Sequence, residues 1–300
     1  MENEDIIRIE GRIAEIGTGL KIARLVPSRM RRMIGAWCFL DHAGPVNFVA
    51  GEGMNVGPHP HIGLQTFTWM IEGTVRHVDS LGSDQIIYPN QVNLMTAGQG
   101  ISHAEISPTD KASRLHAAQL WIALEDKQRH MEPAFQNYPN LPVVKKDEFD
   151  ATVLVGRSLG VTSPVQVFTP LVAVDLVTKK DGAFELMLDP NFEHGITLLE
   201  GKAAINGELL ETGSLLYFAA GHASVAISCD ASTRILIIGG EPFKEDILLW
   251  WNFVARTQEE MEQARHDWVT QSSRFGVIED AGARLVAPSL EGIHLKPSHG

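Results

Sequence analysis

The chain has 300 residues and a formal net charge of −12, with 44% apolar and 21% charged residues. These values are typical of an ordinary globular protein and exclude a disordered or fibrous one, and the length allows one large domain or two of about 150 residues. The net negative charge repels phosphate backbones, so direct binding to nucleic acid is disfavoured. No apolar run approaches the roughly 20 residues that span a bilayer, and no basic amphipathic stretch indicates a membrane surface.

The amino-terminal sequence and the cysteine content both favour a reducing cytoplasm. The chain starts MENEDIIRIEGRI, with acids where a signal peptide carries positive charge before an apolar stretch. Cys38 and Cys229 are the two cysteines, and they form no CxxC pattern. We therefore expect both to be buried, reduced residues rather than a disulfide framework.

Strand-like segments bounded by Gly, Pro, Asn or Asp recur along the whole chain. They lie at residues 64–80, 91–100, 114–124, 165–178, 183–189, 195–207, 214–221 and 233–240. Short strands with regular turn signals predict an all-β barrel or sandwich. The polar, Pro-containing segment at residues 126–152 is expected to connect two β units. A loose repeat, TWMIEGTVRH against ITLLEGKAAI, agrees with a duplicated barrel.

One helix is predicted near the carboxyl end, at about residues 257–275. Thr257 can cap it, and Glu260 three residues later completes a capping-box pattern. Met261, Ala264 and Trp268 follow at helical spacing and are expected to pack on a barrel. Gly276 is the expected stop, and residues 282–300 are expected to be extended.

Two short pairs of candidate metal ligands carry most of the chemical information: His59-Pro60-His61 and His103-Ala104-Glu105. In a strand, the i, i+2 spacing directs both side chains of a pair to one face. The residues between the pairs are enough for several strands to turn back and bring the pairs together. An isolated HxH pair is weak evidence, because 12 histidines give about 0.5 such pairs by chance; the alternative is structural histidines in a sheet or turn.

The flanking residues and the type of ligand favour a metal centre. Pro58 and Gly63 flank the first pair, and the turn at residues 97–100 precedes the second, where glycine lets the backbone approach a site closely. Three imidazoles and a carboxylate with open positions are typical of non-haem iron. A structural zinc site would normally be closed by four ligands. Ligand identity leaves Fe(II), Ni, Co, Cu, Mn and catalytic Zn open.

The sequence resembles the pirin family of the cupin superfamily. The resemblance lies in PHPHIGLQTFTWMIEG (58–73) and NLMTAGQGISHAEISP (93–108), and continues in LHAAQLWIAL (115–124), MEPAFQ (131–136) and IIGGEPFKE (237–245). It implies a bicupin of two antiparallel jelly-roll β-barrels, with a metal-binding cupin domain at residues 1–140. A second cupin domain, without metal ligands, would occupy residues 141–300 and carry the terminal helix.

The resemblance also implies one metal ion, commonly iron, held by residues matching His59, His61, His103 and Glu105. Some members of the family act as quercetin 2,3-dioxygenases, and others are described as regulators that contact transcription-factor complexes. The chain departs from the family pattern at residues 62–65, where it has Ile-Gly-Leu-Gln, and at Asn90, where glycine is usual. These departures make the expected pocket wall less polar.

The remaining histidines are interpreted as structural. His194 and His222 lie near the matching places in the second barrel but form no HxH or HxE pair, and we expect them on the surface or in loops. His42, His77, His116 and His130 are interpreted as isolated, with His42 and His116 considered as neighbours of the cleft.

The expected activity is a dioxygenase reaction that opens a flavonol-type, quercetin-like aromatic enol-ketone with O2. Glu105 would act as the catalytic base and take the hydroxyl proton of the substrate. Trp69 and Met95 are candidate pocket residues, with core packing as the alternative. Two other functions stay open: a non-enzymatic redox-responsive regulator that acts through a protein partner, and a vestigial fold that its metal stabilises.

Overall fold

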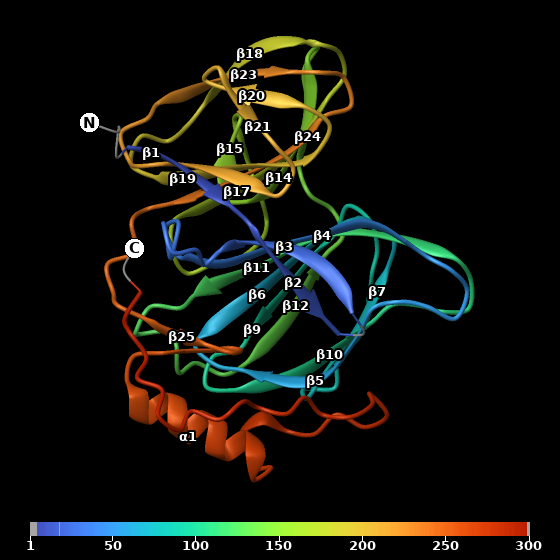
Figure 1. Ribbon diagram of the computed structural model, residues 1–300, viewed down its shortest axis with the longest axis vertical. Coiled ribbons are helices and arrows are strands. Elements are labelled where there is room, and N and C mark those ends of the chain that lie inside the picture. Colours follow the sequence, from blue (N-terminus) through green and yellow to red (C-terminus); the bar gives the residue numbers. More distant parts are fainter. Residues whose placement is uncertain (1–4, 18, 299–300) are drawn as a thin grey trace.

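Two β units lie one above the other in the computed structural model, and each consists of one seven-stranded and one four-stranded antiparallel sheet (Figure 1). The structure describes residues 5–17 and 19–298. The all-β expectation is confirmed: the strands form two cupin-type jelly-roll units, and the one α-helix of the described residues lies below the lower unit. No helix among the described residues is long and apolar enough to cross a membrane.

The first unit contains the strands that carry both ligand pairs. Its seven-stranded sheet has the order β12 (Ala134–Tyr138), β9 (Val92–Thr96), β6 (Leu64–Glu72), β11 (Ser113–Ala123), β4 (Trp37–Phe48), β3 (Leu20–Val26) and β2 (Arg12–Ile16). Its four-stranded sheet has the order β5 (Asn55–His61), β10 (Ile101–Ile106), β7 (Val75–Asp79) and β8 (Asp84–Ile87).

The second unit repeats this arrangement. Its seven-stranded sheet has the order β1 (Ile6–Glu10), β22 (Ser214–Phe218), β19 (Glu193–Glu200), β24 (Arg234–Gly240), β17 (Leu171–Thr178), β14 (Phe149–Val155) and β13 (Val143–Lys145). Its four-stranded sheet has the order β18 (Gly182–Met187), β23 (Ser224–Cys229), β20 (Ala203–Ile205) and β21 (Glu208–Leu210). Two hairpins complete the strands: β15 (Arg157–Ser158) with β16 (Val161–Thr162), and β25 (Leu248–Trp250) with β26 (Phe253–Ala255).

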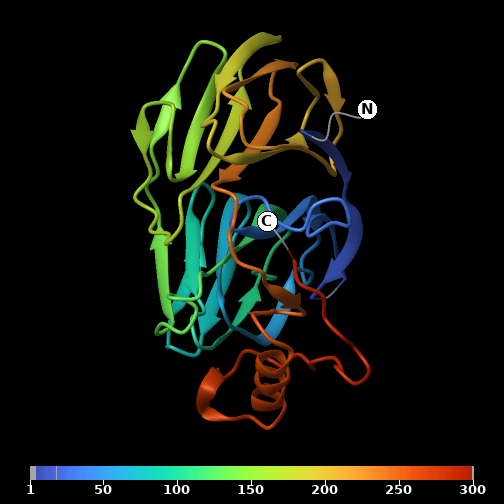
Figure 2. The ribbon, with the colours of Figure 1, turned by 90° about the vertical axis from the view of Figure 1, so that its left-hand side faces the viewer.

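The two units exchange their terminal segments. The first strand, β1, pairs with β22 of the upper unit, whereas the chain after β24 returns to the lower unit, where the hairpin β25–β26 and the helix pack (Figures 1 and 2). The expected connection carries β12, which pairs with β9, and β13, which pairs with β14. A domain boundary near residue 140 stays a proposal.

A large hydrophobic core joins the two seven-stranded sheets, and Trp37 lies within it. The Trp37 indole is fully buried, meets the Phe67 ring edge-on at 5.5 Å between centroids, and donates to the Gly239 carbonyl of the upper unit at 3.0 Å. Phe67 comes from β6 and Gly239 from β24, so this one side chain contacts both units.

We expect Trp37→Ala to lower the free energy of unfolding by about 3–5 kcal/mol, since truncating a buried Trp removes apolar burial and leaves a cavity. Chemical denaturation followed by circular dichroism measures the change. Val286→Ala is the control, because Val286 is 88% exposed; equal loss in both variants would contradict the prediction.

The helix α1 begins as predicted but ends earlier. It spans Gln258–Val269, its N-cap Thr257 accepts from the Glu260 backbone amide, and Met261, Ala264 and Trp268 are buried. The predicted end at residue 275 is wrong. Gln271 has φ 56°, and the amides of Gln271 and Ser272 donate to the carbonyls of Trp268 and Asp267, which closes the helix in a Schellman motif.

Three further expectations can be compared with the structure. The strand predicted at residues 165–178 starts only at Leu171, directly after Pro170, which has no amide to donate to a ladder. Cys38 and Cys229 are free and buried, as expected. Residues 282–298 form no helix or strand, in agreement with an extended tail, and residues 299–300 lie outside the described residues.

Candidate metal centre

Strands β5 and β10 bring the two ligand pairs together. They are antiparallel neighbours, with His103 opposite His59 and Ile101 opposite His61. The i, i+2 spacing places both histidines of the first pair on the face that His103 shares, and the His59 and His103 ring centroids are 4.3 Å apart. The Gly63 amide donates to the Gly98 carbonyl at 2.9 Å, which ties the ends of the two motifs together.

The three imidazoles converge on one point in a buried site. One ligand atom from each of His59, His61 and His103 lies within 4.8 Å of the other two, and all three side chains are buried. The Nε2 atoms of His61 and His103 are 3.0 Å apart. Burial lowers the pKa of His59 to about 4 and holds the pKa values of His61 and His103 well below the usual value. The rings are therefore neutral at pH 7 and can offer lone pairs to a cation.

Hydrogen bonds assign the tautomers of the first two imidazoles. The Nδ1 atom of His59 contacts the Gly57 carbonyl at 2.9 Å, and the Nδ1 atom of His61 contacts the Asn252 carbonyl at 3.0 Å. Because a carbonyl only accepts, each Nδ1 carries the proton and donates it. Each Nε2 is then an unprotonated acceptor that points into the shared space.

His77 and Asp79 assign the tautomer of the third imidazole. The His77 Nε2 atom donates to the Asp79 carboxylate at 3.1 Å, so the His77 Nδ1 atom accepts from the His103 Nδ1 atom at 3.3 Å. Burial alone raises the pKa of Asp79, but hydrogen bonds from His77 and Ser83 bring it below the usual value. The His103 Nε2 atom is thereby free of a proton. The interpretation of His77 as an isolated residue is wrong. His77 lies on β7 two residues before Asp79, and its ring contacts both the Asp79 carboxylate and the His103 imidazole.

We expect Asp79→Asn to weaken metal binding by roughly 10- to 100-fold, the usual effect of changing a residue that orients a metal ligand. The Oδ1 atom accepts from the Leu81 and Ser83 amides, so the new amide nitrogen faces His77 and reverses the proton positions along His77 and His103. Chelator competition measures the affinity. Asp84→Asn, an exposed carboxylate one strand away, is the control, and an unchanged affinity in Asp79→Asn would contradict the proton assignment.

Glu105 lies in the same cavity but outside the group of three imidazoles. The ladder between β5 and β10 is regular at His103 and shifts before Glu105, which pairs with Val56. The extra residue of this bulge lies in β5, between Val56 and His59, since β10 keeps a regular register with β7 through Glu105. Pro58 contributes to the irregularity because it has no amide, and its carbonyl accepts from the Leu285 amide. Burial raises the pKa of Glu105, so this carboxylate holds a proton more readily than an exposed one.

A cavity of about 570 Å³ opens beside the imidazoles, within the usual range for small-molecule sites. Phe39 and Trp121 stack on one wall at 3.9 Å and 11°, and the Trp121 ring meets His61 edge-on at 5.2 Å. The hairpin β25–β26 supplies Trp250 and Trp251 to the same cavity. The walls therefore present flat aromatic surfaces next to the imidazoles.

The structure separates the other candidate residues from this cavity. Trp69 and Met95 are buried in the core between the units, so the core alternative holds. The interpretation of His42 and His116 as isolated residues is wrong, because their Nε2 atoms are 2.8 Å apart. Both lie in the interior rather than in the cavity. His130 is exposed.

In the second unit, the surface interpretation of His194 is wrong, because this residue of β19 is only 1% exposed. His222 follows β22 in a loop, as expected, and its ring meets Phe218 edge-on.

The two departures from the family pattern have local explanations. Asn90 has φ 65°, a left-handed conformation in which asparagine is the usual substitute for glycine. The Gln65 side chain is buried and donates to the Thr96 hydroxyl, away from the cavity.

Comparison with known families agrees with this geometry. Residues 19–122 match the model of the family Pirin, and residues 173–276 match that of the Pirin C-terminal cupin domain. A Pseudomonas aeruginosa protein, provisionally named quercetin 2,3-dioxygenase, is 47% identical over 94% of this chain and 90% of its own length. The chain belongs to the pirin family.

Solved structures of pirin relatives share the fold. A crystal structure named quercetin 2,3-dioxygenase, from Acinetobacter baumannii, has a TM-score of 0.96 and 56% identity, with 99% of each chain covered. The bacterial pirin YhhW from Escherichia coli, in complex with nickel(II), has a TM-score of 0.61 and 21% identity, with 79% of this chain and 99% of that chain covered. The second comparison supports the fold alone.

The donor set of this pirin fits a divalent metal ion. Three neutral imidazoles direct unprotonated Nε2 atoms at one another. Without a cation between them, the 3.0 Å approach of the His61 and His103 nitrogens sets two acceptors face to face. Imidazole ligands suit iron, nickel, copper and zinc, so the donor set defines a metal site without selecting the ion.

Proposed function

We propose that this pirin is an iron(II)-dependent dioxygenase that opens flavonol-type substrates with O2. The observation that supports the proposal most is the convergence of three unprotonated imidazole nitrogens in a cavity that is also lined by four aromatic side chains, Phe39, Trp121, Trp250 and Trp251. Three protein ligands leave coordination positions open, which is typical of non-haem iron sites that bind substrate or O2. The name of the 56% identical Acinetobacter baumannii protein agrees with this reaction class.

His59, His61 and His103 would hold the ion, and Glu105 would serve as a fourth ligand or as the base. When bound, the metal supplies Lewis-acid and one-electron chemistry for the enol-ketone and O2. The stacked pair Phe39 and Trp121 offers a face for the planar rings of the substrate.

Glu105 takes the proton from the substrate hydroxyl and thereby produces the electron-rich enolate that reacts with O2. The partly enclosed position of the carboxylate suits this role, because burial raises its pKa toward that of a useful base. The Glu105 carboxylate has no hydrogen-bond partner within the part of the chain that the structure describes, so its acceptor capacity is available to a ligand.

The overall reaction consumes one O2 for each flavonol. The ring carbon that carries the hydroxyl loses both of its carbon–carbon bonds, keeps its oxygen and leaves as carbon monoxide. Both oxygen atoms of O2 stay in the ester and carboxylate groups of the product, so the substrate is oxidised and O2 is reduced without another reductant.

An O2 electrode with quercetin tests the proposal directly. The protein, purified without added metals and then loaded anaerobically with iron(II), should consume O2 and quercetin in a ratio of one to one. Quercetin binding without O2 uptake, with iron or with any of the other candidate metals, would contradict the enzymatic proposal and favour the redox-responsive regulator.

A further inference from the structure

The hairpin β25–β26 has a turn that its sequence does not favour. Trp250 pairs with Phe253, so Trp251 and Asn252 form a two-residue loop. Trp251 has φ 52°, whereas Asn252 is not among the residues with positive φ. At the first position of a two-residue hairpin loop, positive φ is a conformation that glycine, asparagine and aspartate adopt most readily. A tryptophan there is strained, and such strain persists only where surrounding contacts hold it.

The strained turn contacts the metal centre through its backbone. The Asn252 carbonyl accepts the His61 Nδ1 proton at 3.0 Å, although the two residues are 191 positions apart. Metal-binding histidines commonly donate their second ring nitrogen to such an acceptor, which fixes the tautomer and the orientation of the ring. Because no side-chain acceptor contacts this nitrogen among the described residues, the turn supplies its partner.

The hairpin is attached to the strand end that carries His61. The Val254 amide donates to the Ile62 carbonyl at 3.1 Å, and Ile62 and Phe253 form a β-bridge. Gly63 permits this approach, since it has φ 68° and a Cβ there would clash with the Val254 carbonyl. Ile62, next to His61, thus contacts Phe253 and Val254, which follow Asn252 directly. These contacts fix the position of the Asn252 carbonyl relative to His61.

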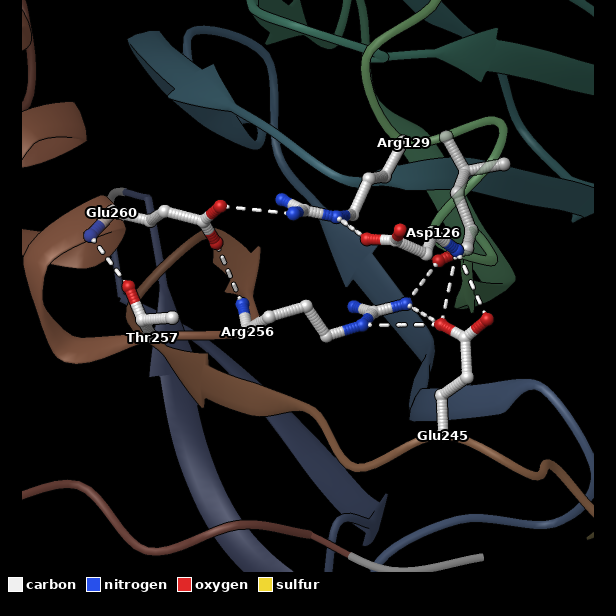
Figure 3. A network of polar contacts seen from close by, with 7 residues as sticks. Asp126, Arg129, Glu245, Arg256, Thr257 and Glu260 are labelled. Carbon is white, nitrogen blue, oxygen red and sulfur yellow. Dashed lines mark hydrogen bonds and ion pairs between the residues drawn. The ribbon is translucent and has the colours of Figure 1, made fainter.

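A network of ion pairs holds the start of α1 to the loop after β11 (Figure 3). Arg256 pairs with Glu245 and donates to the Leu124 carbonyl, and Arg129 pairs with Glu260 at 2.9 Å. The Asp126 amide donates to Glu245. These contacts fix the segment that follows the hairpin against the first unit.

We infer that the Trp251–Asn252 turn is a positioning element of the metal centre, so that a segment beyond the second unit completes the site in the first. The Asn252 carbonyl directs the His61 Nε2 atom at the ion, and the backbone strain at Trp251 is sustained by the contacts of the hairpin. The inference rests on the proposed metal site but not on the dioxygenase reaction.

Two substitutions at Trp251 separate the turn from the indole. Proline cannot adopt φ 52°, so Trp251→Pro displaces the Asn252 carbonyl, whereas Trp251→Gly accepts the positive φ and removes the indole alone. Zinc(II) affinity, measured by competition with a chromophoric chelator, should fall roughly 10- to 100-fold in Trp251→Pro relative to Trp251→Gly. In the zinc-loaded protein, proton NMR should show the His61 Nδ1–H signal in Trp251→Gly and lose it in Trp251→Pro.

Asn206→Pro is the matched control. Asn206 has φ 51° and opens the two-residue turn Asn206–Gly207 between β20 and β21 in the second unit, and this substitution should leave zinc affinity unchanged. If Trp251→Pro does not fold, Trp251→Val replaces it, since a β-branched residue is an outlier at positive φ.

Two outcomes would overturn the inference. The first is a folded Trp251→Pro, or its Trp251→Val substitute, with the zinc affinity of the parent. The second is an equal loss of affinity in Trp251→Gly, which would assign the effect to the indole. Absence of zinc binding in the parent protein would instead contradict the metal site and the proposed function with it.

Discussion

His59→Ala should lose its metal, with content falling from about one ion per chain to less than roughly a tenth of that. The His59 ring lies opposite His103 across the ladder and supplies one of the three converging nitrogens. Two imidazoles remain after the substitution. Glu105 does not belong to the compact group of ligand atoms, so it does not replace the missing third imidazole. Elemental analysis of protein purified without added metals measures the content.

The same variant should lose O2 uptake and thermal stability together. A metal that binds the folded chain stabilises it in proportion to its occupancy, so the melting temperature of the parent should fall on chelation and that of His59→Ala should not. His130→Ala is the control, because it removes an exposed imidazole from another part of the first unit. Stoichiometric metal in His59→Ala would show that the three imidazoles are not the binding site.

The sequence allowed prediction of the three imidazoles because a strand has a fixed period of two. Once His59 and His61 are placed on a strand, they share a face, and the same holds for His103 and Glu105. The antiparallel pairing of β5 with β10 then brings the two pairs together, and the Gly63 amide, which donates to the Gly98 carbonyl, ties the ends of the two motifs. The strand period predicts which side chains share a face, whereas the pairing of β5 with β10 is a contact between segments about 40 residues apart.

The position of Glu105 outside the group of three imidazoles could not be predicted from spacing. The extra residue of β5 between Val56 and His59 could not be predicted either, because it appears only when β5 pairs with β10. His77 and Asp79 have the same i, i+2 spacing as His103 and Glu105. A histidine followed two residues later by an acid is too common a pattern to identify a site by itself. Their role became visible when β7 was placed beside β10.

Long-range exchange between the units was the hardest feature to predict. Nothing in residues 6–10 indicates that β1 pairs with β22, more than 200 positions away. The contact between His61 and Asn252 is similar, because it uses a backbone carbonyl, which every residue has. Side-chain identity carries no signal for such a contact, so only the fold reveals it.

Glu105→Gln should retain its metal and lose about 10²- to 10⁴-fold in turnover, the usual contribution of a general base. The amide keeps the size of the carboxylate but cannot take a proton from the substrate hydroxyl. Metal should be retained because the three imidazoles form their own compact group. Steady-state O2 uptake with quercetin gives the turnover, and elemental analysis gives the metal content. Glu52→Gln, which changes an exposed carboxylate, is the control.

Raising the pH distinguishes a base from a ligand at Glu105. A flavonol that arrives already ionised needs no protein base, so the deficit of Glu105→Gln should shrink as the pH approaches the pKa of the substrate hydroxyl. A carboxylate that acts only as a metal ligand gives a different result, because its loss weakens metal binding at every pH and an ionised substrate does not restore it. A deficit that stays constant with pH, together with a lowered metal content, would therefore reassign Glu105 from proton transfer to coordination.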